Sequence, residues 1–295
     1  FRAIRRFAEL PDYMQVWPAH GAGSACGKAL GAVPSTTVGY EKLFGWAFQI
    51  HEEEAFVEAL LEGQPEAPKY FAEMKRVNKE GPTVLHGMPT PEMLPAYRLP
   101  ELLAGGATGI DARSAERFAA GHIAGSLNIP RDMMAGWSGW LLNYEDPFYL
   151  VADPEDIPAV VHALVYIGLD KIAGYFETSV IEMLEQQGVE LSCYELAHPS
   201  ELASKIDDGS VLLVDVRGES EWQEEHIPGA HHYMLGYLAD TADEIINGKP
   251  IVVQCQSSAR AAIGASLLKA RGAGHVVNMI GGLTAWKNAG LPIEN

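Results

Sequence analysis

The sequence has few cysteines, no long apolar run and no excess of positive charge, and each absence excludes a class of protein. Among its 295 residues there are three cysteines, with no Cys-x-x-Cys pair and no cluster with histidine. This usage argues against a disulfide scaffold or a structural zinc site and favours a reducing cytoplasm. No apolar run reaches the ~18 residues that cross a bilayer, and no secretory signal peptide is visible. We therefore expect a cytoplasmic protein that does not enter a membrane.

The charge balance limits the partners. The chain carries 21 lysines and arginines against 39 aspartates and glutamates, a formal net charge of -18. Such a surface repels a phosphate backbone, so we expect no nucleic-acid partner. It also repels small anions at long range, so an anionic substrate would need a local positive site. The length predicts about two or three domains.

An internal repeat organises most of the chain. The first copy reads Gly-Ile-Asp-Ala-Arg over residues 109–113 and Gly-His-Ile-Ala-Gly over 121–125. The second copy reads Leu-Val-Asp-Val-Arg over 213–217 and Glu-His-Ile-Pro-Gly over 225–229. The interval from Asp to His is eleven residues in both (111 to 122 and 215 to 226). The shared spacing of unusual residues predicts two similar domains.

Short apolar strands alternate with helices in each copy. Strands are predicted over 148–151 and 251–254, and helices over 157–166 and 260–271. This alternation is typical of an α/β domain with a largely parallel sheet. Ligands of such sheets bind at the carboxyl ends of the strands, which is where Asp215 and Cys255 lie.

Cys255 is the best candidate for a nucleophile. It follows an apolar strand and precedes an alanine-rich helix, so unpaired backbone N–H groups and the helix dipole favour its thiolate. The same groups suit the terminal sulfur of a Cys–S–S⁻ persulfide, which a thiol, sulfite or cyanide would remove. The alternative is an inert core cysteine. The loop that would bind the sulfur consists of Gln256, Ser257, Ser258, Ala259 and Arg260.

The order Asp-x-Arg, His-Ile-x-Gly and Cys-x4-Arg resembles the rhodanese family. The ending Gly-Gly-x-x-x-Trp over 281–286 and Gly-Leu-Pro over 290–292 strengthens the resemblance, which is strong over 193–295 and weaker over 89–192. It implies a sulfurtransferase in which Cys255 carries the persulfide, Arg260 closes the loop, and Asp215 and Arg217 support it.

The sequence departs from the family at two positions. Ser258 replaces a glycine, and it would be mildly strained if the position needs a positive φ. Glu225 stands where glycine usually precedes His-Ile. Two other functions stay open. One is a phosphatase of the related cell-cycle family, although its Cys-x5-Arg loop is one residue longer. The other is a non-catalytic docking or regulatory module.

The first repeat has no cysteine at the matching place. Its strand is followed by Asp153, Glu155 and Asp156, whose carboxylates would repel a persulfide, so we expect this domain to be inactive. The carboxylates form either the charged start of a helix or a site for a cation or partner. His122 and His226 are expected to make structural hydrogen bonds, because both copies keep the histidine and one keeps the nucleophile.

Residues 15–28 and 34–41 resemble the C-terminal part of metallo-β-lactamase-fold proteins, over residues 8–80. Among these they are most similar to fusions of a persulfide dioxygenase with rhodanese domains. The resemblance implies iron or zinc bound by residues upstream, since the His-x-His-x-Asp-His motif is absent, and we assign no metal ligand in this chain. His20 either lines that site or makes a structural hydrogen bond, and Cys26 is expected to be structural.

These observations predict an α/β protein of three parts. Residues 1–88 would end a metallo-β-lactamase-fold αββα domain that begins before Phe1, 89–192 would form an inactive rhodanese-like domain, and 193–295 an active one. The expected activity is sulfur transfer through Cys255, fused to a metal-dependent persulfide dioxygenase or hydrolase. The rhodanese domains need no cofactor. The expected partners are small sulfur-containing anions or thiols, and a second copy in a homo-oligomer.

Overall fold

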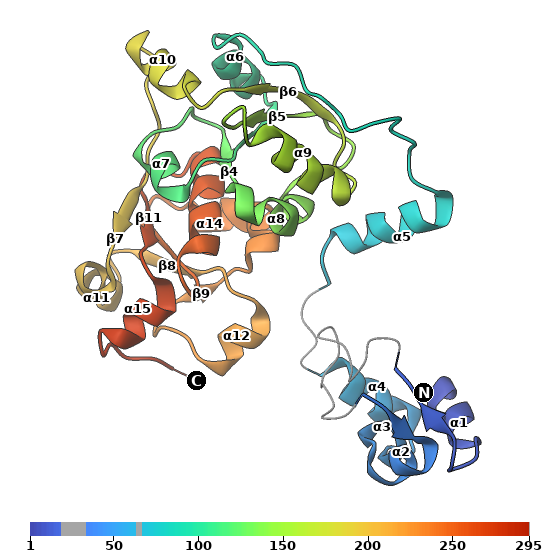
Figure 1. The fold of residues 1–295 in the computed structure, drawn as a ribbon. Helices are drawn as coiled ribbons and strands as arrows, with labels where there is room; N and C mark the ends of the chain where they lie inside the picture. Colours follow the sequence, from blue (N-terminus) through green and yellow to red (C-terminus); the bar gives the residue numbers. More distant parts are fainter. Residues whose placement is uncertain (19–33, 63–66, 295) are drawn as a thin grey trace. The chain divides into compact units, whose positions relative to one another are not determined.

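The computed structural model describes residues 1–18, 34–62 and 67–294, which fall into two compact units, Phe1–Gln64 and Pro65–Asn295 (Figure 1). In the smaller unit, strands β1 (Gln15–Val16) and β2 (Thr36–Thr37) pair antiparallel. Its helices are α1 (Arg2–Ala8), α2 (Val38–Phe44), α3 (Trp46–Gln49) and α4 (Glu53–Leu61).

The sequence over residues 37–50 predicts one helix, and the structure divides it at Gly45. This residue is extended and separates α2 from α3. A Cβ at Gly45 would lie 2.7 Å from the carbonyl oxygen of Glu41, so the tight end of α2 needs glycine. The side chain of Thr37 accepts a hydrogen bond from the Tyr40 N–H and caps α2.

The larger unit contains two parallel sheets flanked by helices, as the strand–helix alternation predicted. The first sheet has the order β4-β3-β5-β6, and the second has the order β7-β11-β10-β8-β9. The strands of the first are β3 (Thr108–Asp111), β4 (Leu127–Asn128), β5 (Phe148–Val151) and β6 (Ile172–Phe176). Those of the second are β7 (Glu195–Ala197), β8 (Leu212–Asp215), β9 (His231–His232), β10 (Ile251–Gln254) and β11 (Val276–Met279).

Helices cover the sheets in the same order in both copies. The first copy has α6 (Arg98–Ala104), α7 (Ala115–Ala120), α8 (Met134–Leu141), α9 (Ile157–Tyr166) and α10 (Val180–Gln186). The second has α11 (Pro199–Asp207), α12 (Glu219–Glu224), α13 (Leu238–Ile245), α14 (Ala259–Ala270) and α15 (Gly282–Asn288). Short 3₁₀ turns, η1 (Arg131–Met133) and η2 (Leu235–Tyr237), precede α8 and α13.

Helix α5 (Tyr70–Glu80) precedes the first sheet. Lys69, just before it, forms an ion pair of 2.7 Å with Asp240, and the Tyr70 ring meets Trp140 edge-on. These contacts tie α5 to the larger unit, and the predicted domain boundaries at residues 88 and 192 stay predictions.

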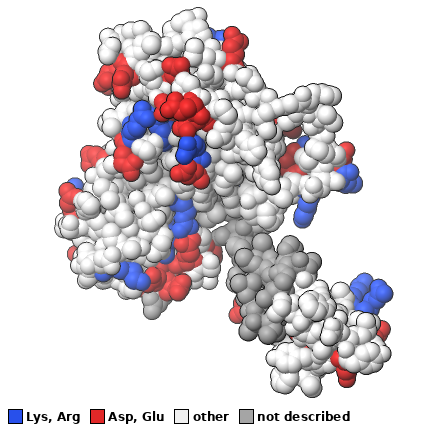
Figure 2. Space-filling model, viewed as in Figure 1, with Lys and Arg blue, Asp and Glu red and all other residues white. Residues whose placement is uncertain are grey.

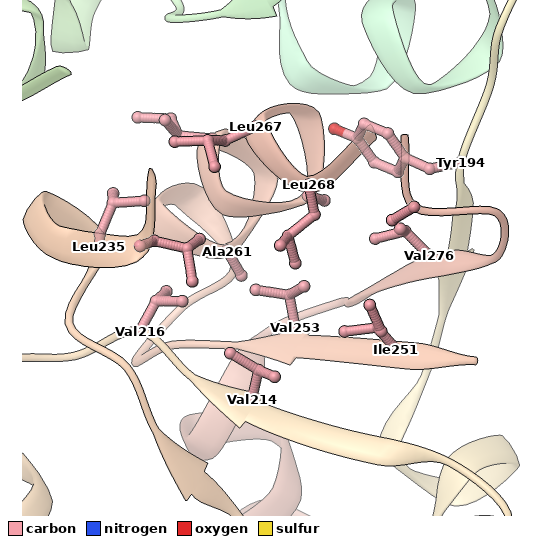
Figure 3. Packing of buried hydrophobic residues seen from close by; sticks show 14 of the residues in the cluster. Tyr194, Val214, Val216, Leu235, Ile251, Val253, Ala261, Leu267, Leu268 and Val276 are labelled. Atoms are coloured by element: carbon pink, nitrogen blue, oxygen red, sulfur yellow. The ribbon is translucent and has the colours of Figure 1, made fainter. Parts of the chain in front are cut away.

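Helix α14 lies at the centre of the larger unit. Its residues 261–268 are all buried, and Figure 3 shows Val214, Ile251 and Val253 of the sheet pointing toward it. Its far side meets the first copy, where the Asn128 N–H donates to the Ser266 hydroxyl at 3.0 Å. The small alanine and glycine residues of α14 permit this packing on two sides. The packing holds α14 in place, and Cys255 lies just before its N-terminus.

The two copies also pack against each other away from α14. The Trp140 ring lies on Gly236, where a Cβ would come within 2.3 Å of Cε3. The first copy therefore packs directly against the second.

Candidate functional site

Cys255 lies where the sequence predicted, between the end of β10 and the start of α14. It is 1% exposed and belongs to the core cluster under α14. The backbone N–H of Ala261, in the first turn of α14, donates a hydrogen bond to Sγ over 3.4 Å. The helix N-terminus therefore places a donor on the sulfur, which stabilises negative charge there.

Ser258 has φ 79° and ψ -17°, in the left-handed region. Among the described residues other than glycine, only His86 shares a positive φ. The conformation costs a side-chain-bearing residue ~1–2 kcal/mol, as expected for a position that the family usually gives to glycine. The left-handed turn brings the chain from the strand into α14 within four residues, from Cys255 to Ala259.

The start of α15 holds the loop from the side. The Leu283 N–H donates to the Cys255 carbonyl over 2.8 Å, and the Thr284 N–H donates to the Gln256 carbonyl over 3.1 Å. A Cβ on Gly282 would lie 2.0 Å from the Cys255 carbonyl oxygen. The glycine pair, known from sequence only as a family motif, thus permits the backbone contact that holds two loop carbonyls on α15.

Arg260 donates two hydrogen bonds to Glu221, with Nη1 to Oε2 at 2.6 Å and Nη2 to Oε1 at 2.7 Å. The pair holds the pKa of Glu221 below its ordinary value, and the same hydrogen bonds raise the pKa of Arg260. The family resemblance implied that Arg260 closes the loop, and the structure shows that a carboxylate matches its charge. Sequence reasoning missed Glu221, and its place six residues after Asp215 gave no signal by itself.

Asp215 and Arg217 form a buried ion pair beside α12. Arg217 donates to both carboxylate oxygens of Asp215. Arg217 also donates to the carbonyls of Glu221 and Glu225, at 3.2 and 2.7 Å. The pair therefore fixes α12, the helix that carries Glu221, and supports the loop through it.

The first repeat contains the same buried pair. Arg113 donates to Asp111 and to the carbonyl of Gly121 at 2.9 Å. The Asp-x-Arg motif therefore forms the same buried ion pair in both copies, with or without a cysteine at the matching place.

His122 and His226 make the structural hydrogen bonds that we expected. Each ring places Nδ1 near a carbonyl four residues earlier, on Phe118 at 2.9 Å and on Trp222 at 3.1 Å. A carbonyl can only accept, so Nδ1 carries the proton. Burial lowers the pKa of His122 to about 4. Neither histidine ring forms a hydrogen bond with Cys255.

Ala152 occupies the place of Cys255 in the first repeat, because Val151 pairs with Asp111 as Gln254 pairs with Asp215. Two of the three carboxylates that follow are matched by cations, with Asp153 3.6 Å from Arg117 and Asp156 2.6 Å from Arg131. They line a cavity of about 130 Å³ together with Arg113, Ser114 and Thr178. These pairs favour the charged helix start over a cation site.

Two other residues singled out from the sequence, His20 and Cys26, lie outside the described residues. Within the described residues, no group of three or more histidine, cysteine, aspartate or glutamate side chains could hold a metal ion. In the same part of the chain, no helix is long and apolar enough to cross a membrane.

Residues 198–289 match the family described as the rhodanese-like domain. Over 87 residues the chain is 36% identical to a sulfurtransferase of Allochromatium vinosum, across 30% of this chain and 81% of that protein. It is 31% identical, also over 87 residues, to a thiosulfate sulfurtransferase of Coxiella burnetii, across 30% of this chain and 78% of that protein.

A solved structure of a metallo-beta-lactamase from Staphylococcus aureus is 40% identical, with a TM-score of 0.45, over 60% of this chain and 48% of that protein. The chain likewise spans about half the length of several other curated relatives that it matches.

Proposed function

Because this chain belongs to the rhodanese-like family through its C-terminal domain, we propose that it transfers sulfane sulfur through a persulfide on Cys255. In the first half-reaction the Cys255 thiolate attacks the outer sulfur of thiosulfate or of a low-molecular-weight persulfide. The sulfur–sulfur bond of the donor breaks, and sulfite or a thiolate leaves with the electron pair. In the second, an acceptor thiolate, sulfite or cyanide attacks the outer sulfur, and Cys255 leaves as a thiolate.

The observation that carries the proposal is the polarity of the loop around Sγ. The Ala261 N–H donates to the sulfur, while the carbonyls of Cys255 and Gln256 accept from α15. One backbone donor therefore faces the sulfur and two nearby acceptors are occupied by α15, which favours an anionic thiolate or persulfide. In the proposed mechanism the attacking group is the Cys255 thiolate, and the attack itself transfers no proton.

The test is sulfur loading of the intact chain by thiosulfate. We expect mass spectrometry to find one added sulfur on Cys255, and Cys255→Ser to abolish thiocyanate formation from thiosulfate and cyanide. Cys193 is exposed and supplies a matched control, because Cys193→Ser changes the same atoms and should retain turnover. Undiminished turnover in Cys255→Ser would refute the assignment.

We also propose that residues 1–88 are the end of a metallo-β-lactamase-fold domain in a longer persulfide dioxygenase or hydrolase fusion. The motif resemblance over residues 8–80 supports this, and it implies iron or zinc. Among the described residues, no group of histidine, cysteine, aspartate or glutamate side chains fits such a metal.

For the partners we propose small sulfur-containing anions or thiols, and a second copy in a homo-oligomer. On the face shown in Figure 2, lysines and arginines lie beside acidic side chains, and the net charge of -18 disfavours nucleic acid.

A further inference from the structure

Glu221 holds the positive charge of the sulfur-binding loop. Both terminal nitrogens of Arg260 contact its carboxylate, at 2.6 and 2.7 Å. The two side chains are partly buried, with 22% of Arg260 and 36% of Glu221 exposed. A bidentate ion pair of this kind has a defined geometry and is more than a transient surface contact.

The backbone of α12 positions Glu221 independently of Arg260. The Gly218 N–H donates to Oε2 over 3.1 Å, and Arg217 binds the Glu221 carbonyl from behind. The Glu221 carboxylate is therefore held at the loop before any sulfur donor binds. The hydrogen bond from Arg260 also lowers the pKa of Glu221, so the group stays ionised near neutral pH.

In the first repeat the matching helix also pairs with the segment after the strand, but there the arginine is on the helix and the carboxylate is at the place of Gln256. Arg117 stands six residues after Asp111, as Glu221 stands six after Asp215. It pairs with Asp153, which follows β5 in the way that the loop follows β10. The contact between this helix and this loop is thus common to both copies, and the acidic partner on the helix accompanies the copy that has the cysteine.

The ion pair between Glu221 and Arg260 changes the local charge that an incoming sulfur donor meets. The charge of Arg260 attracts anions, but Glu221 cancels most of that field at the distance of a ligand. Lys287, on α15, is similarly matched by Glu225 at 2.7 Å. The negative surface of the whole chain adds a repulsion that grows with the charge of the donor.

We propose that Glu221 is a positioning residue for Arg260 and sets the charge preference of the site, favouring monoanionic sulfur donors over dianionic ones. This rests on the proposed sulfur transfer through Cys255 and names the donor class for the same site. Removing the carboxylate charge while keeping its shape would release Arg260 for a dianion.

Two donors of almost equal shape test the charge preference. Thiosulfate is a dianion, and methanethiosulfonate is a monoanion in which a methyl group replaces one oxygen. In each case the Cys255 thiolate bonds to the outer sulfur, the sulfur–sulfur bond breaks, and sulfite or methanesulfinate leaves with its electron pair. The measurement is kcat/KM for each donor with cyanide as acceptor, expressed as the ratio of thiosulfate to methanethiosulfonate.

In Glu221→Gln we expect this ratio to rise roughly ten-fold, the effect of one charge acting over ~7 Å at an effective dielectric of about 30. The rise should shrink with added salt. Glu221→Asp, which keeps the charge, should stay near the wild-type ratio. A partly unfolded variant lowers both kcat/KM values equally, so its loss cancels in the ratio.

Asp153→Asn is the matched control. It also removes one carboxylate from an arginine pair and changes the net charge equally, but in the repeat with Ala152, so the ratio should not change. An unchanged ratio in Glu221→Gln, or an equal rise in Asp153→Asn, would overturn the proposal for Glu221 while leaving sulfur transfer intact. If the wild-type chain accepts sulfur from neither donor, the proposed function fails and this inference fails with it.

Discussion

Replacing Gly282 with alanine should damage both the stability and the reactivity of the sulfur-binding loop. Gly282 has φ 53°, and an added Cβ would lie 2.0 Å from the Cys255 carbonyl oxygen. The left-handed backbone alone costs alanine ~1–2 kcal/mol. Relief of the contact also separates α15 from the loop and breaks the hydrogen bonds to the carbonyls of Cys255 and Gln256, worth about 1 kcal/mol each. The total loss of unfolding free energy is therefore about 3–4 kcal/mol.

Gly290→Ala is the matched control. Gly290 has φ 70° and no atom within 4 Å of an added Cβ, so it carries only the backbone cost of ~1–2 kcal/mol. Urea unfolding of the two variants isolates the contact with Cys255, and the rate of persulfide formation from thiosulfate reports on the loop. We expect Gly282→Ala to lose sulfur loading and Gly290→Ala to keep it. The reasoning is refuted if both variants lose the same stability and both still load sulfur.

Two further predictions concern backbone strain and protonation. Ser258→Gly should raise the unfolding free energy by up to about 1 kcal/mol, because glycine adopts the observed φ without strain; an unchanged or lower urea midpoint with sulfur loading retained would contradict this. Burial lowers the pKa of His122 to about 4, so the unfolded chain binds a proton first as the pH falls below ~6.5, and stability should fall by up to about 3 kcal/mol between pH 6.5 and 4. In His122→Asn, the urea midpoint should fall less steeply as the pH is lowered across this range.

The internal repeat allowed much of the fold to be predicted. Asp111 with Arg113 and Asp215 with Arg217 form the same buried pair, because identical spacing after a strand places the same groups at the same turn. The positions of the strand and the helix around Cys255 followed from the local apolar pattern, because each segment buries its own apolar residues in the domain to which it belongs. The division of the helix at Gly45 was not foreseen, since it depends on contact between α2 and α3.

The sequence by itself determined that Cys255 ends a strand and precedes a helix, because strand ends and helix starts depend on a few neighbouring residues. Ser258 in a left-handed conformation belongs to the same class of local inference. Only the tertiary structure decided the charge of the site. Glu221 and Arg260 are 39 residues apart, and they meet because β8 and β10 are adjacent, with Gln254 beside Asp215. The strand order brings the helix after one strand to the loop after the other, and no short-range pattern encodes that order.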